Sequence, residues 1–143
     1  MTPALAVAIA VVFGWTGLLI GVSFVEAPIK FRAPGVTLQI GLGIGRLVFR
    51  VVNTIEVVTA AALVVALLVA GPDPTITVAA GVAVVTLLVQ LVALRPRMSR
   101  RAEAVRARPD DVPRSRVHHG YVALECVKLV ALLVAGTAAL ALV

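Results

Sequence analysis

Four long apolar runs constrain this chain more than any other feature of its sequence. They cover residues 4–25, 47–70, 76–94 and 121–143, and each is close to the ~20 residues with which a helix crosses the hydrocarbon core of a bilayer. The runs are continuous, whereas the strands of a transmembrane barrel alternate with a period of two. The sequence therefore predicts a single all-α domain, a bundle of four transmembrane helices.

Composition supports this class. The 143 residues have a mean hydropathy of +1.09, and only 14% are charged, fewer than in a soluble domain. No positive charge precedes the first run, and its length exceeds the core of a secretion signal, so we expect a helix that is retained. The expected helices cover about 4–26, 38–70, 75–95 and 117–142, and the lipid bilayer is their first partner.

Basic residues concentrate in two of the three connections. Twelve of the thirteen lie in or next to them, and the exception is Lys128. Lysine and arginine in short loops mark the cytoplasmic side of a membrane protein. We therefore expect a cytoplasmic basic loop at 95–116, with a helical extension and a turn at 109–113, and both termini on the extracytoplasmic side of the cell (inner) membrane.

We expect no nucleic-acid partner, although the net charge is +6. Orientation and attraction to anionic lipid headgroups account for the arginines, and no aromatic residues are interleaved with them. The stretch "GLGIG" at 41–45 lacks the lysine spacing of a phosphate-binding loop. Gly41 and Gly45, like Gly17 and Gly21, are four residues apart and predict close helix contact instead.

Three of the four predicted helices carry a polar stripe. A charged side chain in a membrane span costs about 2.5–3.5 kcal/mol on insertion scales, so each needs a partner or a purpose. The stripes recur at spacings of three, four and seven, which keeps each on one helix face. Their members are Ser23, Glu26 and Lys30; Arg46, Asn53 and Glu56; and His118, Tyr121, Glu125 and Lys128.

All three stripes fall in the cytoplasmic half of the predicted bundle. We therefore expect helices one, two and four to enclose one polar pocket, with the third helix, which offers only Gln90, as its wall. His118 and His119 are about 100° apart around a helix, so one of the two is expected to face the pocket.

One interpretation of this pocket is structural. The carboxylates of Glu26, Glu56 and Glu125 can neutralise the cations Lys30, Arg46 and Lys128, and such a network would fix the register of the helices. Asn53, Tyr121 and the two histidines add donors and acceptors that ion pairing alone does not require. The pocket is therefore also a candidate for binding or catalysis.

A metal site is the first functional interpretation. Glu26, Glu56, His119 and Glu125 provide carboxylate and imidazole ligands of the kind that iron, copper or zinc accept. The Glu-x-x-His signature of di-iron bundles is absent, and His118 and Glu125 are two helical turns apart.

Acid–base chemistry is the second interpretation. Glu26, Glu56, His118, His119 and Glu125 are then the candidate catalytic residues of a membrane-embedded oxidoreductase, oxygenase or isomerase. The substrate is a lipophilic small molecule from the inner leaflet, oriented by a second set of residues: Lys30, Arg46, Asn53, Tyr121 and Lys128. Two alternatives stay open: a proton-coupled carrier or channel that forms a homo-oligomer, and a non-catalytic assembly subunit.

Short patterns add a resemblance to a known family. With Gly21, Ser23, Phe24 and Pro28 in "GVSFVEAPIKF", Asn53 in the second helix, and His119–Gly120 at the start of the fourth, the chain resembles the small four-helix membrane proteins related to anthrone oxygenases. The resemblance implies a membrane-embedded bundle that acts on a hydrophobic small molecule with oxygen and without an obvious cofactor. The glutamates and Lys128 match no pattern of that family.

Overall fold

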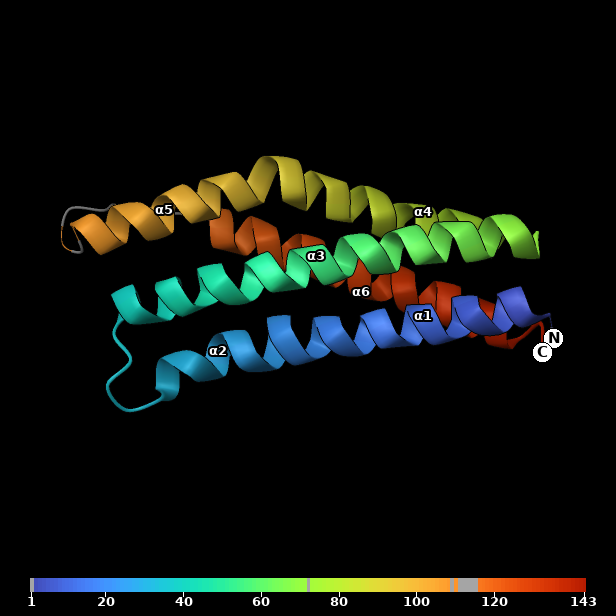
Figure 1. The fold of residues 1–143 in the computed structure, drawn as a ribbon, viewed down its shortest axis with the longest axis horizontal. Coiled ribbons are helices and arrows are strands. Elements are labelled where there is room, and N and C mark those ends of the chain that lie inside the picture. The colour runs from blue at the N-terminus through green and yellow to red at the C-terminus, as the bar shows by residue number, and fades with distance from the viewer. Residues whose placement is uncertain (1, 72, 109, 111–115) are drawn as a thin grey trace.

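Four long helical spans lie side by side in the structure (Figure 1). A computed structural model describes residues 2–71, 73–108, 110 and 116–143, and no strand occurs among them. Each span is long and apolar enough to cross a membrane. This confirms the predicted all-α bundle of four transmembrane helices.

The first span contains more than one kind of helix. α1 (Pro3–Leu19) continues into a π-helical segment, η1 (Ile20–Glu26), then α2 (Ala27–Ile29) and a single 3₁₀ turn, η2 (Lys30–Arg32). Thr2 caps its start, because the threonine Oγ1 accepts a hydrogen bond from the backbone N–H of Leu5 at 3.2 Å. The span ends where Ala33 becomes extended, as a residue that precedes a proline prefers.

The second and third spans meet in a short turn. α3 (Leu38–Ala70) begins at the capping residue Thr37 and ends at Gly71, which has a left-handed φ of +64°. α4 (Pro74–Val89) begins at Asp73, whose carboxylate accepts a hydrogen bond from the N–H of Thr75 at 2.7 Å. These local signals fix where the helices start and stop.

The third span extends well beyond the apolar run. α4 leads into a π-helical segment, η3 (Gln90–Leu94), and then α5 (Arg95–Ala107), while α6 (Val117–Leu140) forms the fourth span. Within the basic segment 95–116, for which a helical extension was expected, the chain is helical as far as residue 107. Most of the predicted turn at 109–113 lies outside the described residues.

Both π-helical segments precede a proline, Pro28 or Pro96. Proline lacks an N–H and crowds the carbonyl one turn earlier, and a locally wider turn relieves this conflict. The π turn also changes which side chains share a face. Gln90 and Arg95 would be about 140° apart in a regular α-helix, but five residues make about one turn of a π-helix.

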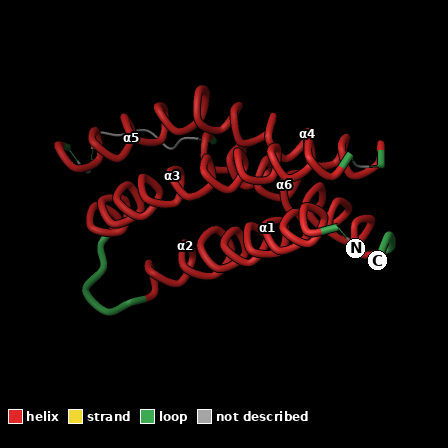
Figure 2. Tube along the Cα trace, turned by 45° about the vertical axis from the view of Figure 1, so that its right-hand side comes forward, coloured by secondary structure: helices red, strands yellow, loops and turns green. Residues whose placement is uncertain are grey.

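The two ends of the bundle differ in character. Both chain termini and the α3–α4 turn lie at one end, whereas the α2–α3 connection and the far end of α5 lie at the other (Figures 1 and 2). We call the latter the basic end, since it holds the basic segments 30–32 and 95–108. Towards the terminal end the core is apolar, with buried Trp15, Leu63, Ile76 and Leu132. Side chains such as Leu68, 78% exposed, cover the outer surface, as expected for contact with lipid.

Glycines allow the first span to approach α3 at the basic end. A Cβ on Gly41 would lie 2.2 Å from the Phe31 ring, and one on Gly45 would lie 3.0 Å from the Lys30 ammonium. The contact predicted for "GLGIG" is therefore formed. A Cβ on Gly17 or Gly21 would meet no described atom within 4 Å, so the contact predicted for that pair is not made within the described chain.

Candidate functional site

Lys128 is at the centre of a buried polar network in the middle of the bundle. Its side chain is fully buried, and its Nζ donates to three oxygens: Glu56 Oε1 at 2.5 Å, Gln90 Oε1 at 2.8 Å and Glu125 Oε1 at 2.9 Å. An ammonium group has three donors. Each therefore has an acceptor, and these contacts connect α3, η3 and α6.

The first span completes this network with two neutral donors. The Trp15 indole N–H donates to Glu56 Oε1 at 3.1 Å, and the Ser23 hydroxyl donates to Glu125 Oε2 at 2.8 Å. The Gln90 amide also donates to Glu125 Oε1 at 2.6 Å. Both carboxylate oxygens of Glu125 are thus hydrogen-bonded, as a buried ion requires.

Arg95 links this network to the basic end. Its Nη2 donates to the Tyr121 hydroxyl at 2.5 Å and lies 3.7 Å from Glu56 Oε2. The guanidinium carbon lies 4.3 Å from the centre of the Phe49 ring and 4.7 Å from that of Tyr121. Ring contacts and ion pairing together hold the guanidinium in one place.

The charges of this cluster balance. Glu56 and Glu125 carry two negative charges, and Lys128 and Arg95 carry two positive charges. Each of these four side chains is at most 9% exposed. A buried set with no net charge avoids the cost of an uncompensated ion in a low-dielectric interior. The geometry is that of the ion-pair interpretation, with Arg95 in the place expected for Lys30 and Arg46.

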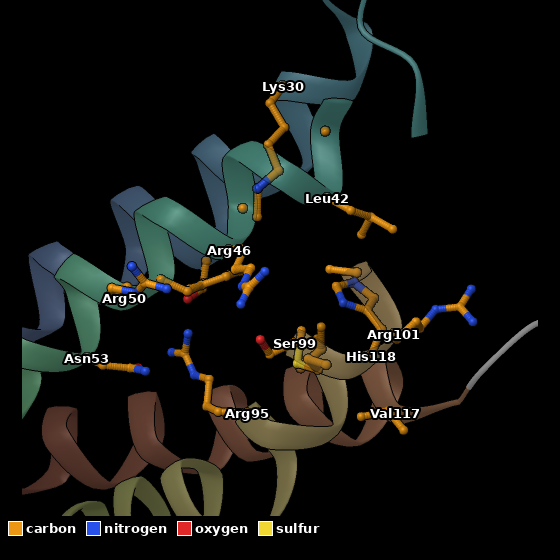
Figure 3. Close-up of a pocket in the computed structure, with 18 of the residues that line it drawn as sticks. Lys30, Leu42, Arg46, Arg50, Asn53, Arg95, Ser99, Arg101, Val117 and His118 are labelled. Carbon is orange, nitrogen blue, oxygen red and sulfur yellow. The ribbon is translucent and has the colours of Figure 1, made fainter. Parts of the chain in front are cut away.

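A cavity of about 720 Å³ lies between this network and the basic end. The end of the first span, α3, α5 and the start of α6 surround it, and Ser23 and Arg95 belong both to its lining and to the network. Its volume is within the range of about 300–1,000 Å³ typical of ligand pockets. Figure 3 shows the polar side chains of Lys30, Arg46, Arg50 and Arg95 around this space.

The lining combines apolar walls with positive charge. Its larger apolar residues include Phe24, Phe31, Leu42, Phe49, Leu91 and Met98. Its charged residues are all basic as far as the structure describes them: Lys30, Arg46, Arg50, Arg95 and Arg101, with His118 beside them. Outside the lining, Glu26 lies 3.4 Å from Lys30 and Glu103 lies 2.6 Å from Arg46.

The structure divides the ten predicted site residues into two groups and two outliers. Glu56, Tyr121, Glu125 and Lys128 belong to the buried cluster, whereas Lys30, Arg46, Asn53 and His118 line the cavity. Glu26 pairs with Lys30 one turn further along the same span, outside both groups. His118 and His119 are both exposed, but His118 belongs to the cavity lining and His119 does not.

The predicted metal ligands are not brought together. Among the described residues, no three of His, Cys, Asp and Glu are placed to hold a metal ion. The Lys128 ammonium lies between Glu56 and Glu125, and Glu26 and His119 lie elsewhere. The expected metal site at Glu26, Glu56, His119 and Glu125 therefore has no support in the described residues, and the Lys128 ammonium lies between two of its four proposed ligands.

Sequence reasoning missed three contributions to this region. Trp15 lies in an apolar run without a charged residue, and the sequence places Arg95 only among the cations of the basic loop. Gln90 was assigned to a wall, although it bridges Lys128 and Glu125. The signal that could have found the last two is Pro96, since a proline near a helical polar pair favours the π turn that puts Gln90 and Arg95 on one face.

Comparison with known protein families, curated proteins and solved structures found no match to this chain. The resemblance to proteins related to anthrone oxygenases therefore stays a prediction.

Proposed function

We propose that this protein is an integral membrane protein that binds a lipophilic anion in the cavity at its basic end. The observation that carries the proposal is the lining itself, in which apolar walls surround basic side chains and no described lining residue is acidic. Apolar walls favour the hydrocarbon part of a ligand. Lysine and arginine favour an oxyanion through charge-assisted hydrogen bonds.

Arg50 is a basic residue of the lining that no described carboxylate neutralises. Its side chain lines the cavity and has no ion-pair partner among the described residues, whereas Lys30, Arg46 and Arg95 each have a carboxylate within 4.0 Å. An anion in the cavity would provide that partner. The charge of Arg50 should therefore matter for binding but contribute little to folding.

In this proposal the basic end faces the cytoplasm, because lysine and arginine accumulate on that side of membrane proteins. Both termini are then extracytoplasmic, and the membrane is the cell (inner) membrane. The cavity lies in the cytoplasmic half of the bundle, so the ligand reaches it from the inner leaflet or from the cytoplasm.

Conversion of the bound molecule, its transport and homo-oligomer formation stay predictions. His118 is the one predicted acid–base residue in the cavity lining. Glu125 is unsuited to that role, since its two oxygens already accept hydrogen bonds from Ser23, Gln90 and Lys128. Within the proposal, His118 is therefore the candidate for proton transfer to the ligand.

The test measures binding of radiolabelled dodecanoate to the protein in phosphatidylcholine nanodiscs by scintillation proximity, with empty nanodiscs as blank. We expect saturable binding that dodecanoate itself displaces and that dodecanol and dodecylamine displace poorly. Arg50→Gln should weaken it about tenfold, since one charge-assisted hydrogen bond is lost.

The matched control is Arg100→Gln, which removes the same charge from an exposed α5 residue outside the lining. It should leave the affinity unchanged. Equal displacement by the acid, the alcohol and the amine, or equal weakening by both variants, would show that the cavity does not select anions.

A further inference from the structure

We infer that the cavity selects an acidic ligand that carries a hydroxyl group beside its oxyanion, with Arg95 binding the oxyanion and Asn53 accepting the hydroxyl. This inference deepens the proposed binding of a lipophilic anion and depends on it. It concerns the end of the cavity nearest the buried network, where both residues belong to the lining.

Asn53 and Arg95 face each other across that end. Phe49, Asn53 and Glu56 are four and three residues apart on α3, a spacing that places their side chains on one helix face. Arg95 contacts the first and the last of these, over the Phe49 ring and 3.7 Å from Glu56 Oε2. It therefore lies opposite Asn53, and Figure 3 shows the two side chains pointing towards one another.

Arg95 uses only part of its donor capacity within the protein. Its Nη2 contacts Tyr121 and Glu56, whereas its Nε and Nη1 are buried and have no hydrogen-bond partner among the described groups. Buried donors without acceptors destabilise a protein, and charged ones do so most. Two donors on a fixed cation therefore favour an oxyanion as their partner.

Asn53 presents the opposite requirement. Its Oδ1 is buried and has no donor among the described groups. A plain carboxylate can satisfy Arg95, but it has no hydrogen to give to Asn53. An ammonium head group, as in dodecylamine, could donate to Asn53, but the positive charge of Arg95 would repel it. The pair is complementary to an acid that also has an O–H.

Two head groups share this chemistry: a 2-hydroxy carboxylate, and a phosphate monoester that retains one proton. Each places an O–H next to a negatively charged oxygen. The hydrocarbon tail would lie against the apolar part of the lining, which includes Phe24, Leu42 and Leu91. Alcohols lack the oxyanion, and simple fatty acids lack the hydroxyl.

The experiment compares matched competitors in the nanodisc assay. Competition against labelled dodecanoate measures 2-hydroxydodecanoate against dodecanoate. It also measures dodecyl phosphate, below its second pKa of about 6, against its methyl ester, which keeps the single negative charge but loses the O–H. In the unmodified protein we expect the hydroxylated member of at least one pair to bind about fivefold more tightly, the size of one net hydrogen bond. The pair that shows the preference identifies the head group.

Variants assign the preference to Asn53. Asn53→Leu should abolish the ratio within the pair, and Asn53→Ala should do the same if the leucine variant is not stable. Arg50→Gln should weaken both members of a pair equally. A preference that survives loss of the Asn53 amide would overturn the assignment.

The inference and the proposed function fail in different ways. If dodecanoate does not bind saturably, the proposed function is wrong. If dodecanoate binds and neither pair shows a ratio in the unmodified protein, the cavity binds anions without reading a hydroxyl, and this inference alone is wrong.

Discussion

Replacing Lys128 with methionine should destabilise the bundle more than any other single loss of charge. The substitution removes three hydrogen bonds, of 2.5, 2.8 and 2.9 Å, from a fully buried ammonium. It leaves Glu56 and Glu125 with one remaining cation, Arg95, at 3.7 Å from Glu56. Removing one partner of a buried ion pair costs about 3–5 kcal/mol in free energy of unfolding, and we expect a loss of that size.

The assay is unfolding by sodium dodecyl sulfate in mixed micelles, followed by fluorescence. Trp15 is the only tryptophan in the chain and donates its indole N–H to Glu56, so its emission reports on the network itself. The matched control is Lys30→Met. Lys30 is 10% exposed, and its partner Glu26, 3.4 Å away, is 32% exposed, so water partly screens this pair and a smaller loss than for Lys128→Met is expected.

A compensating variant makes this prediction specific to charge balance. Adding Glu56→Gln to Lys128→Met leaves Glu125 and Arg95 with opposite charges, so the double variant should be more stable than Lys128→Met alone. Two results would refute the reasoning: a loss below about 1 kcal/mol for Lys128→Met, or a double variant whose two effects simply add. Either would mean that the ion pairs do not hold the helices in register.

Two further predictions concern helix packing and the π turn. Gly136→Ala should cost about 1–3 kcal/mol in free energy of unfolding, because its Cβ would lie 2.9 Å from the Phe13 ring and 3.1 Å from buried Val12. Gly81→Ala, with no described atom within 4 Å of its Cβ, should be neutral or stabilising in the same unfolding assay. Equal effects of the two variants would contradict the packing. Pro96→Ala should let the π turn relax and move Arg95 away from the cavity without unfolding the protein. Dodecanoate binding should then weaken about tenfold, the size of one charge-assisted hydrogen bond. Unchanged binding would show that the turn does not position Arg95.

Much of this fold could be predicted because a bilayer permits few alternatives. Continuous apolar runs of sufficient length must form helices there, and the caps at Thr37 and Asp73 follow ordinary preferences. The stripe of Tyr121, Glu125 and Lys128 was also predictable, since regular α-helical periodicity holds through α6 and turns all three side chains inward.

The partners of that stripe were harder to predict, because they depend on departures from regular helix geometry and on tertiary contacts. Gln90 and Arg95 share a face only through a π turn, which α-helical spacing cannot anticipate. Trp15 joins the network through one indole N–H on an otherwise apolar helix. Glu26 matched the periodicity of its stripe, but it lies at the far end of η1. There it pairs with Lys30 and does not contact the buried network.

The most direct measurement of the central claim is where an acidic amphiphile binds. A dodecanoate analogue with a photoactivatable diazirine near its carboxylate can be cross-linked to the protein in phosphatidylcholine nanodiscs, and the modified residues can be mapped by mass spectrometry. We predict labels on residues that line the cavity, such as Phe49, Leu91 and Met98, and their loss when excess unlabelled dodecanoate is added. Labels confined to outward-facing residues such as Leu68 and Val92, or labels that excess dodecanoate does not reduce, would contradict the claim that the cavity binds a lipophilic anion.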